Sequence, residues 1–169
     1  RKFYYILPST FIKRWTSCPR WCSLLQYRHH PSQDNFNDIL DGRYMEKILG
    51  RGFTQAENGL FVAWALGADG VVAREMDSYS VTPIFLTCLM FSPDFRYSWE
   101  ALVCVGIVPG PGHNTLEPFM RVILEDIASP LRMYDSIRQD FVWCHQSLAI
   151  IWAETQGLSG VTCGNSPGA

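Results

Sequence analysis

Three closely spaced apolar runs lie in the middle of the chain and predict strands of one sheet. Residues 60–66 are apolar without a break, and Gly67-Ala68-Asp69-Gly70 ends that run. Two further runs follow at residues 81–91 and 101–108. Apolar runs of this length between turn residues are typical of strands that are buried on both faces. We therefore expect three buried strands, joined by a polar crossing segment at residues 71–80 and a turn after Phe91.

A helix and a fourth apolar run come next. Apolar side chains recur at three- and four-residue steps over residues 116–127, and Pro118 suits the first turn of a helix. Residues 141–152 are again apolar and predict a fourth strand, which Ala153-Glu154 ends. This region therefore predicts an amphipathic helix that leads into a strand.

The part of the chain before the first strand predicts short helices. Residues 11–25 repeat apolar side chains at helical spacing, with Pro19 starting a second helix. A further short helix is expected over residues 43–49, ended by Gly50, with a loop over residues 51–59. We divide the chain into a helical segment at 1–59 that packs on the core, a core at 60–155 and a loose Gly/Ser/Thr-rich tail at 156–169.

Acidic residues follow two of the predicted strands. Asp69 comes after the first strand and Glu154 after the fourth. Three antiparallel strands, a crossover helix and a parallel fourth strand form an α/β (α+β) mixed sheet of the RNase H-like kind, in which the first and fourth strands are neighbours. Paired carboxylates at that sheet edge would bind a divalent metal and activate water or a DNA 3′-hydroxyl. The alternatives are that Asp69-Gly70 is only a turn, and that this is an ordinary α+β domain whose strands end in acids.

Composition limits the class of protein. Hydrophobic residues make up 47% and aromatic residues 14% of the 169 residues, which indicates one packed globular domain. The net charge of -2 is unfavourable for strong non-specific DNA binding, so any basic surface must be local or lie in other segments. No apolar run is long enough to cross a membrane, and the start has no signal-peptide pattern. The first residue is Arg, so we expect a fragment.

Six cysteines allow two interpretations. Cys88 and Cys104 lie inside apolar runs and are expected to be buried thiols in a reducing compartment. Cys18 and Cys22 are four positions apart and could both face a zinc ion, but no second pair with zinc-ligand spacing follows. Buried cysteines on an amphipathic helix are the favoured interpretation.

Short motifs along nearly the whole chain resemble the transposases of CACTA (En/Spm-like) DNA transposons, in the form found in fungal genomes. The motifs are Phe3-Tyr4-Tyr5-Ile6, Leu25-Gln26-Tyr27-Arg28, Asp38-Ile39-Leu40-Asp41-Gly42, Leu66-Gly67-Ala68-Asp69-Gly70, Thr82-Pro83-Ile84, Ser92-Pro93 with Arg96, Gly106-Ile107-Val108-Pro109-Gly110-Pro111, and Tyr134-Asp135. Their order and spacing follow the family pattern, and the motif that begins at Gly106 is the most specific. The match corresponds to only part of a family member.

The resemblance implies an RNase H-like nuclease with three acids, Mg²⁺ or Mn²⁺ as cofactor, transposon-end DNA as substrate and a location in the nucleus. Asp69 corresponds to the first acid. Glu154 stands where the family has aspartate, and the glycine and proline around that aspartate are also replaced. The third acid would lie beyond residue 169. We therefore expect a degenerate transposase-derived fragment that does not cut and join DNA alone.

The sequence is also compatible with other functions. Arg96 and His113 could contact DNA phosphate, although a solvated turn arginine and a loop histidine are the simpler interpretations. Asp135 could add a carboxylate or cap a following helix. The chain could also be a non-enzymatic remnant or an interaction module that cleaves no DNA, and it could form a homo-oligomer. No membrane partner is expected.

Overall fold

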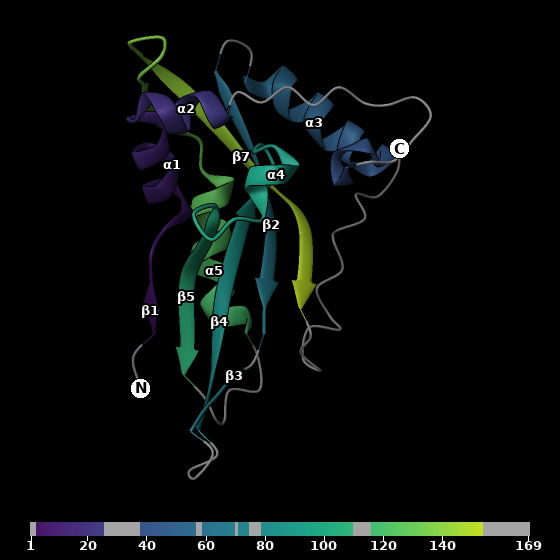
Figure 1. The fold of residues 1–169 in the computed structure, drawn as a ribbon, viewed down its shortest axis with the longest axis vertical. Coiled ribbons are helices and arrows are strands. Elements are labelled where there is room, and N and C mark those ends of the chain that lie inside the picture. The colour runs from purple at the N-terminus through teal and green to yellow at the C-terminus, as the bar shows by residue number, and fades with distance from the viewer. Residues whose placement is uncertain are drawn as a thin grey trace.

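A mixed sheet with helices on both faces forms the protein (Figure 1). The structure is a computed structural model that describes residues 3–25, 38–56, 59–69, 71–74, 79–109 and 116–153. Within those residues seven strands are hydrogen-bonded into one sheet, in the order β1-β5-β4-β2-β7-β6, with β3 paired to β4. The predicted tail at 156–169 lies outside the described residues.

The centre of the sheet consists of three antiparallel strands, as predicted from the apolar runs. They are β2 (Leu60–Ala68), β4 (Tyr79–Cys88) and β5 (Leu102–Pro109). Pro83 of β4 lies just past the last pair between β2 and β4, which joins Ala68 to Ile84. Its missing N–H therefore falls where β2 has already ended.

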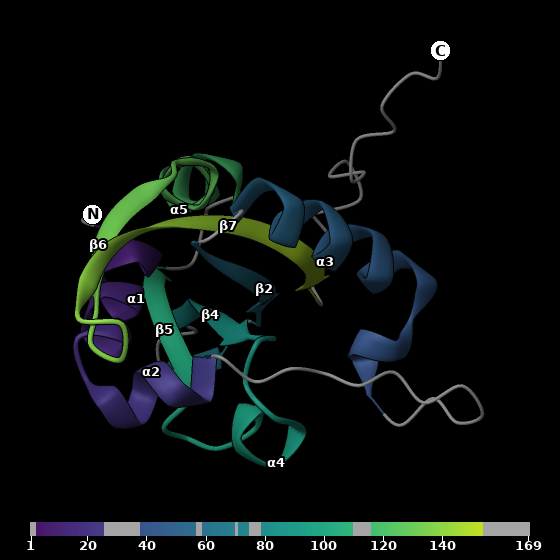
Figure 2. The ribbon, with the colours of Figure 1, turned by 90° about the horizontal axis from the view of Figure 1, so that it is seen from above.

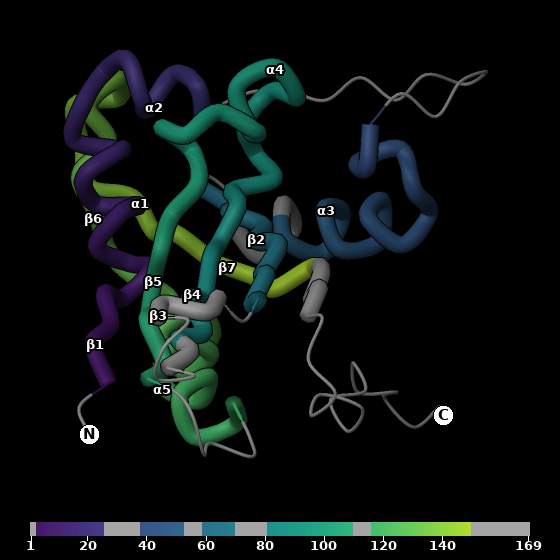
Figure 3. Tube along the Cα trace, turned by 60° about the horizontal axis from the view of Figure 1, so that its bottom comes forward, coloured from purple at the N-terminus to yellow at the C-terminus, as the bar shows by residue number. Residues whose placement is uncertain are grey.

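A helix and a parallel strand complete the centre of the sheet. α5 (Glu117–Ala128) follows β5, and β7 (Asp140–Ala153) pairs with β2 in parallel (Figure 3). Both elements occur where the sequence predicts them. Between them lies β6 (Leu131–Asp135), which forms an antiparallel hairpin with β7 and was not predicted.

Two further strands were also missed. β3 (Val71–Arg74) pairs with β4 within the segment predicted only to cross between strands. β1 (Tyr4–Tyr5) pairs with β5, and the Ile6 N–H donates to the Val105 carbonyl at 2.9 Å. The predicted N-terminal segment therefore contributes a strand to the sheet.

The helices cover both faces of the sheet. Besides α5, they are α1 (Pro8–Thr16), α2 (Pro19–Leu25), the short 3-10 helix η1 (Ile39–Asp41), α3 (Arg43–Ala56) and α4 (Pro93–Arg96). On β2, Trp64 packs on Trp15 of α1, whereas Phe61 lies against Gly52 of α3. Because side chains alternate along a strand, α1 and α3 lie on opposite faces. Figure 2 shows α1 and α2 on one side of the central strands and α3 on the other.

An aromatic cluster joins the N-terminal helices to the sheet. Trp15 contacts Trp64 and Phe91 with ring centroids 5.8 and 5.0 Å apart, and Trp21 of α2 contacts Phe91 and Phe95. Trp64 and Phe91 are fully buried. The cluster contributes strongly to stability, since each such side chain buries on the order of 150–250 Å² of surface.

Among the described helices, none has the length and apolar character needed to cross a membrane.

Candidate functional site

The C-terminal ends of β2 and β7 form the candidate site. The two strands run in parallel register from Leu60 opposite Cys144 to Ala68 opposite Ala153, with one shift after Trp64. Asp69 is the residue after Ala68, and Glu154 is the residue after Ala153. The strands therefore end side by side, about 4.8 Å apart, at one edge of the sheet. Glu154 itself lies outside the described residues.

Asp69 is exposed to solvent and directly follows a strand that is held in the core. It directly follows Ala68, which is buried, at the end of a strand whose first half is buried on both faces. The Asp69 side chain is exposed to solvent. A carboxylate held this way can receive a cation or a phosphate-bound metal without rearrangement of the strand.

A chain of polar contacts links the two strands to the helices behind them. The Trp64 Nε1–H donates to Oε1 of Gln146 on β7 at 2.9 Å, and Gln146 Nε2 donates to the Asp126 carbonyl of α5 at 3.3 Å. The Asp126 carboxylate accepts from the backbone N–H and the hydroxyl of Ser9 on α1, at 2.7 and 2.8 Å. These contacts join β2, β7, α5 and α1 near the middle of the two strands.

Arg96 has a structural role in place of the predicted DNA contact. Its side chain is 0% exposed, and its guanidinium forms a two-pronged pair with the Asp38 carboxylate at 2.6 and 3.2 Å. The same guanidinium donates to the backbone carbonyls of Leu89 and Phe91. A buried guanidinium with these partners is not available to a phosphate, so the predicted DNA contact is wrong. The interpretation of Arg96 as a solvated turn arginine is also wrong, because the side chain is buried.

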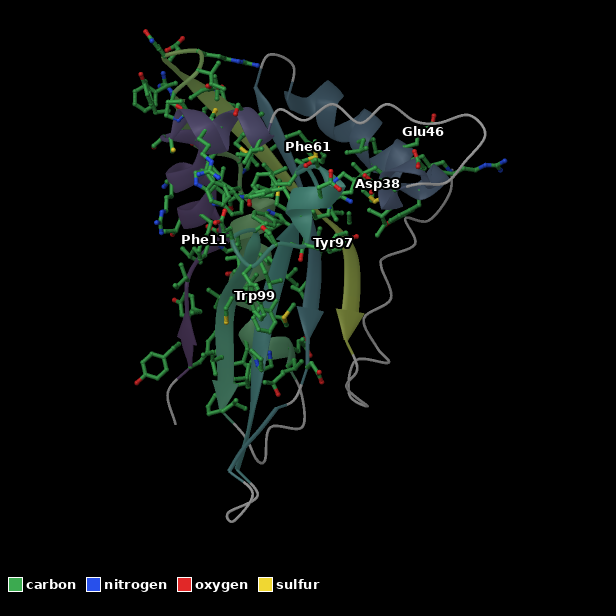
Figure 4. All side chains as sticks on the ribbon, in the orientation of Figure 1. Phe11, Asp38, Glu46, Phe61, Tyr97 and Trp99 are labelled. Atoms are coloured by element: carbon green, nitrogen blue, oxygen red, sulfur yellow. The ribbon has the colours of Figure 1, made fainter. Side chains whose placement is uncertain are left out.

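Asp38 is the partner that spacing along the sequence did not reveal. Asp38 and Arg96 are 58 positions apart and belong to two different motifs of the resemblance. Asp38 also caps η1 by accepting from the Leu40 N–H, and Asp41 accepts from the Asp38 N–H in return. Figure 4 shows Asp38 reaching toward α4. The two motifs therefore meet in a buried ion pair just past the C-terminal end of β4, whereas Asp69 follows Ala68, which pairs with Ile84 in the middle of β4.

His113, the second predicted DNA contact, lies outside the described residues. Asp135 is described and lies far from Asp69, because it precedes the hairpin at the N-terminal end of β7, whereas Asp69 follows the C-terminal end of β2. The described residues after Asp135 form a hairpin turn and β7, not a helix. Its carboxylate instead accepts from the backbone N–H groups of Ile137 and Arg138, which form the hairpin turn. The predicted helix cap is therefore wrong.

Asp135 also bonds to one of the cysteines considered for zinc. The Cys22 thiol donates to Asp135 Oδ1 at 3.2 Å. Burial, together with this hydrogen bond and the negative charge of Asp135, raises the pKa of Cys22. Burial alone would raise the pKa of Asp135, but hydrogen bonds from Arg138, Cys22 and Ile137 and the charge of Arg138 outweigh it and lower that pKa. Cys22 is therefore a neutral, buried thiol that joins α2 to β6.

Within the ranges that the structure describes, no three His, Cys, Asp or Glu side chains lie together in a way that could hold a metal ion. The predicted pair of Asp69 and Glu154 extends beyond those ranges. Comparison with protein-family models, with curated proteins and with solved structures found no match to this chain.

Proposed function

We propose that the chain is a transposase-derived fragment of an RNase H-like catalytic core of the DDE type. In this proposal Asp69 and Glu154 are two carboxylate ligands of Mg²⁺ or Mn²⁺, and transposon-end DNA in the nucleus is the ancestral substrate. The observation that carries the proposal is the parallel register of β2 and β7, in which Ala68 faces Ala153. Two acids that directly follow paired residues on adjacent parallel strands are close enough to share a metal.

The sheet topology supports the same proposal. Three antiparallel strands, β2, β4 and β5, are followed by α5 and then by β7, which pairs with the first of them in parallel. In an RNase H-like core this order brings the acids of the first and fourth strands to one edge. β6 departs from that order, because it inserts a hairpin partner between α5 and β7 at the outer edge of the sheet.

We expect metal binding without DNA cleavage by this chain alone. Two carboxylates supply part of the oxygen shell that Mg²⁺ or Mn²⁺ needs, and the longer side chain of glutamate at position 154 displaces its carboxylate relative to an aspartate. Loss of one ligand from a site for phosphoryl transfer removes several kcal/mol of transition-state stabilisation.

Calorimetric titration with Mn²⁺ tests the metal site. The protein should bind Mn²⁺ with measurable heat, and Asp69→Asn should lose that heat. Asp94→Asn is a matched control, because Asp94 is an exposed aspartate in α4, beyond the opposite end of β4. Equal heats for the protein and Asp69→Asn would refute the metal site.

Incubation with supercoiled plasmid and Mn²⁺ tests the second part of the proposal. We expect no nicking by the 169-residue chain. Nicking that disappears in Asp69→Asn would show that the fragment is an active nuclease, and the expectation of an inactive fragment would then be wrong.

A further inference from the structure

The outer side of the β6–β7 hairpin carries an exposed aromatic surface. The register pairs Arg132 with Trp143 and Tyr134 with Phe141, so all four side chains point to the same side. Phe141 is 57%, Trp143 56% and Tyr134 39% exposed, whereas Met133 between them is buried. We name Arg132, Tyr134, Phe141 and Trp143 the hairpin face.

Three of the four side chains of the hairpin face contact one another, with Phe141 between the other two. The Arg132 guanidinium carbon lies 5.6 Å from the centre of the Phe141 ring, and the Tyr134 ring meets Phe141 edge-on at 5.6 Å. Tyr, Trp, Phe and Arg are the residue types enriched in protein–protein interfaces and at their energetic centres. Side chains that are already held in place lose less conformational entropy when a partner binds.

The charges of the hairpin favour a protein partner over a nucleic acid. Arg132 and Arg138 are balanced by Asp135 and Asp140, so the hairpin is close to neutral. Arg138 also lies 3.5 Å from the Asp135 carboxylate. A surface that neutralises phosphates needs a clear excess of positive charge, and this hairpin has none.

We propose that the hairpin face binds the same face of a second copy of this chain. A two-fold interface needs a surface that is complementary to itself. The hairpin face meets that requirement, because it carries both a cation, Arg132, and three aromatic rings that can accept a cation over their faces. The Arg132 guanidinium can lie over its own Phe141 ring and also contact a ring of the other copy, and no net charge opposes the contact.

The proposed interface is independent of the proposed metal site. The hairpin lies at the N-terminal end of β7, and Asp69 follows the C-terminal end of β2, which runs parallel to β7. Figure 1 shows the hairpin at the upper left end of the molecule, whereas the arrowheads of β2 and β7 end in its lower half. Loss of metal binding would leave this inference unchanged, and the reverse is also true.

Sedimentation equilibrium over a concentration series tests the inference. A hairpin face is small beside the roughly 800 Å² per partner of a standard interface, so we expect a reversible dimer with a micromolar or weaker dissociation constant. Trp143→Ser should raise that constant about tenfold or more, and Arg132→Gln should also raise it. Trp99→Ser is the matched control, because Trp99 is 91% exposed in the loop after α4 and lies outside the hairpin face (Figure 4). It should leave the dimer unchanged.

Three outcomes would overturn the inference. The first is a monomer at every concentration up to about 1 mM, the weak end of measurable affinity. The second is a dimer that Trp99→Ser weakens and Trp143→Ser does not. The third is a monomer whose tryptophan fluorescence responds to a single-stranded oligonucleotide through Trp143, which would assign the surface to nucleic acid. Urea midpoints for all three variants establish that each is folded.

Discussion

At the scale of single residues, Arg96 shows most clearly how the role of a side chain can depend on a partner that is far away in the sequence. Its partner in the buried ion pair is Asp38, 58 positions earlier. Arg96 follows a Ser-Pro turn, and such a residue on a surface is a reasonable phosphate contact. The structure instead surrounds the guanidinium with Asp38 and two backbone carbonyls. The sequence could not reveal this, because Asp38 lies in a different motif and no local periodicity connects the two positions.

Breaking this pair should destabilise the fold strongly. Arg96→Met removes the buried guanidinium from the Asp38 carboxylate, which is only 5% exposed, and we expect a loss of about 3–5 kcal/mol in the free energy of unfolding. Arg121→Met is the matched control, because Arg121 pairs with Glu125 on the exposed side of α5. It should cost less than about 1 kcal/mol. Urea denaturation measures both, and equal losses would contradict a structural role for Arg96.

The lowered pKa of Asp135 makes the free energy of unfolding depend on pH. Its pKa is lowered in the folded protein, so between the folded value and the unfolded value of about 3.9 the unfolded chain binds more protons. The contribution of Asp135 to stability is therefore complete above the unfolded pKa and is lost as the pH falls through the folded pKa. We expect Asp135→Asn to cost about 1–3 kcal/mol at neutral pH, since the asparagine leaves buried donors less well satisfied. In urea denaturation at several pH values, the gap between the two proteins should narrow under acidic conditions; a gap that stays constant would contradict this assignment.

At the scale of elements, α3 shows where a local rule fails. Gly50 predicts the end of a helix at residue 49, yet α3 continues to Ala56. Tertiary packing explains the extension: Gly52 allows the helix to approach Phe61 of β2, and a Cβ atom there would overlap the Phe61 ring. A glycine that ends a helix and a glycine that permits close packing look the same in a single sequence.

The two glycines of α3 should respond in opposite directions to the same change. Gly50→Ala places a methyl group where none of the described residues outside the turns of α3 itself comes within 4 Å, and we expect about 0.5–1 kcal/mol of added stability from helix propensity. Gly52→Ala forces the buried Phe61 ring to move and should lower stability. Thermal or urea denaturation of both variants measures this. If Gly52→Ala were as stabilising as Gly50→Ala, the packing of α3 on β2 would be wrong.

All three strands that were missed are short, and two of them, β3 and β6, lie in hairpins. β3 and β6 contain four and five residues, and they are stabilised by pairing with β4 and β7 rather than by apolar runs of their own. In β6 the signal is present in the alternation of Leu131, Arg132, Met133, Tyr134 and Asp135, where Met133 and Asp135 are buried and Arg132 and Tyr134 are exposed. Five alternating positions are a weak pattern beside a run of buried residues, so tertiary pairing decides whether the strand forms.

At the scale of the whole molecule, the sequence predicted the arrangement that matters for the candidate site. The antiparallel pairing of β2, β4 and β5 and the parallel pairing of β2 with β7 are confirmed, because long apolar runs and one amphipathic helix leave few ways to bury their faces. The edges of the sheet were not predictable in the same way, since β1, β3 and β6 depend on contacts with strands that are already in place. The site at the ends of β2 and β7 follows from the part that was predictable.

The most direct test of a shared metal at the strand ends is paramagnetic broadening by Mn²⁺ in NMR spectra of the ¹⁵N-labelled protein. We expect the amides next to Asp69 and Glu154, including Ala68 and Ala153, to broaden first and most strongly. We also expect Asp69→Asn to abolish this broadening and Asp94→Asn to retain it. Broadening centred elsewhere on the molecule, or broadening that persists in Asp69→Asn, would contradict a metal shared at the strand ends.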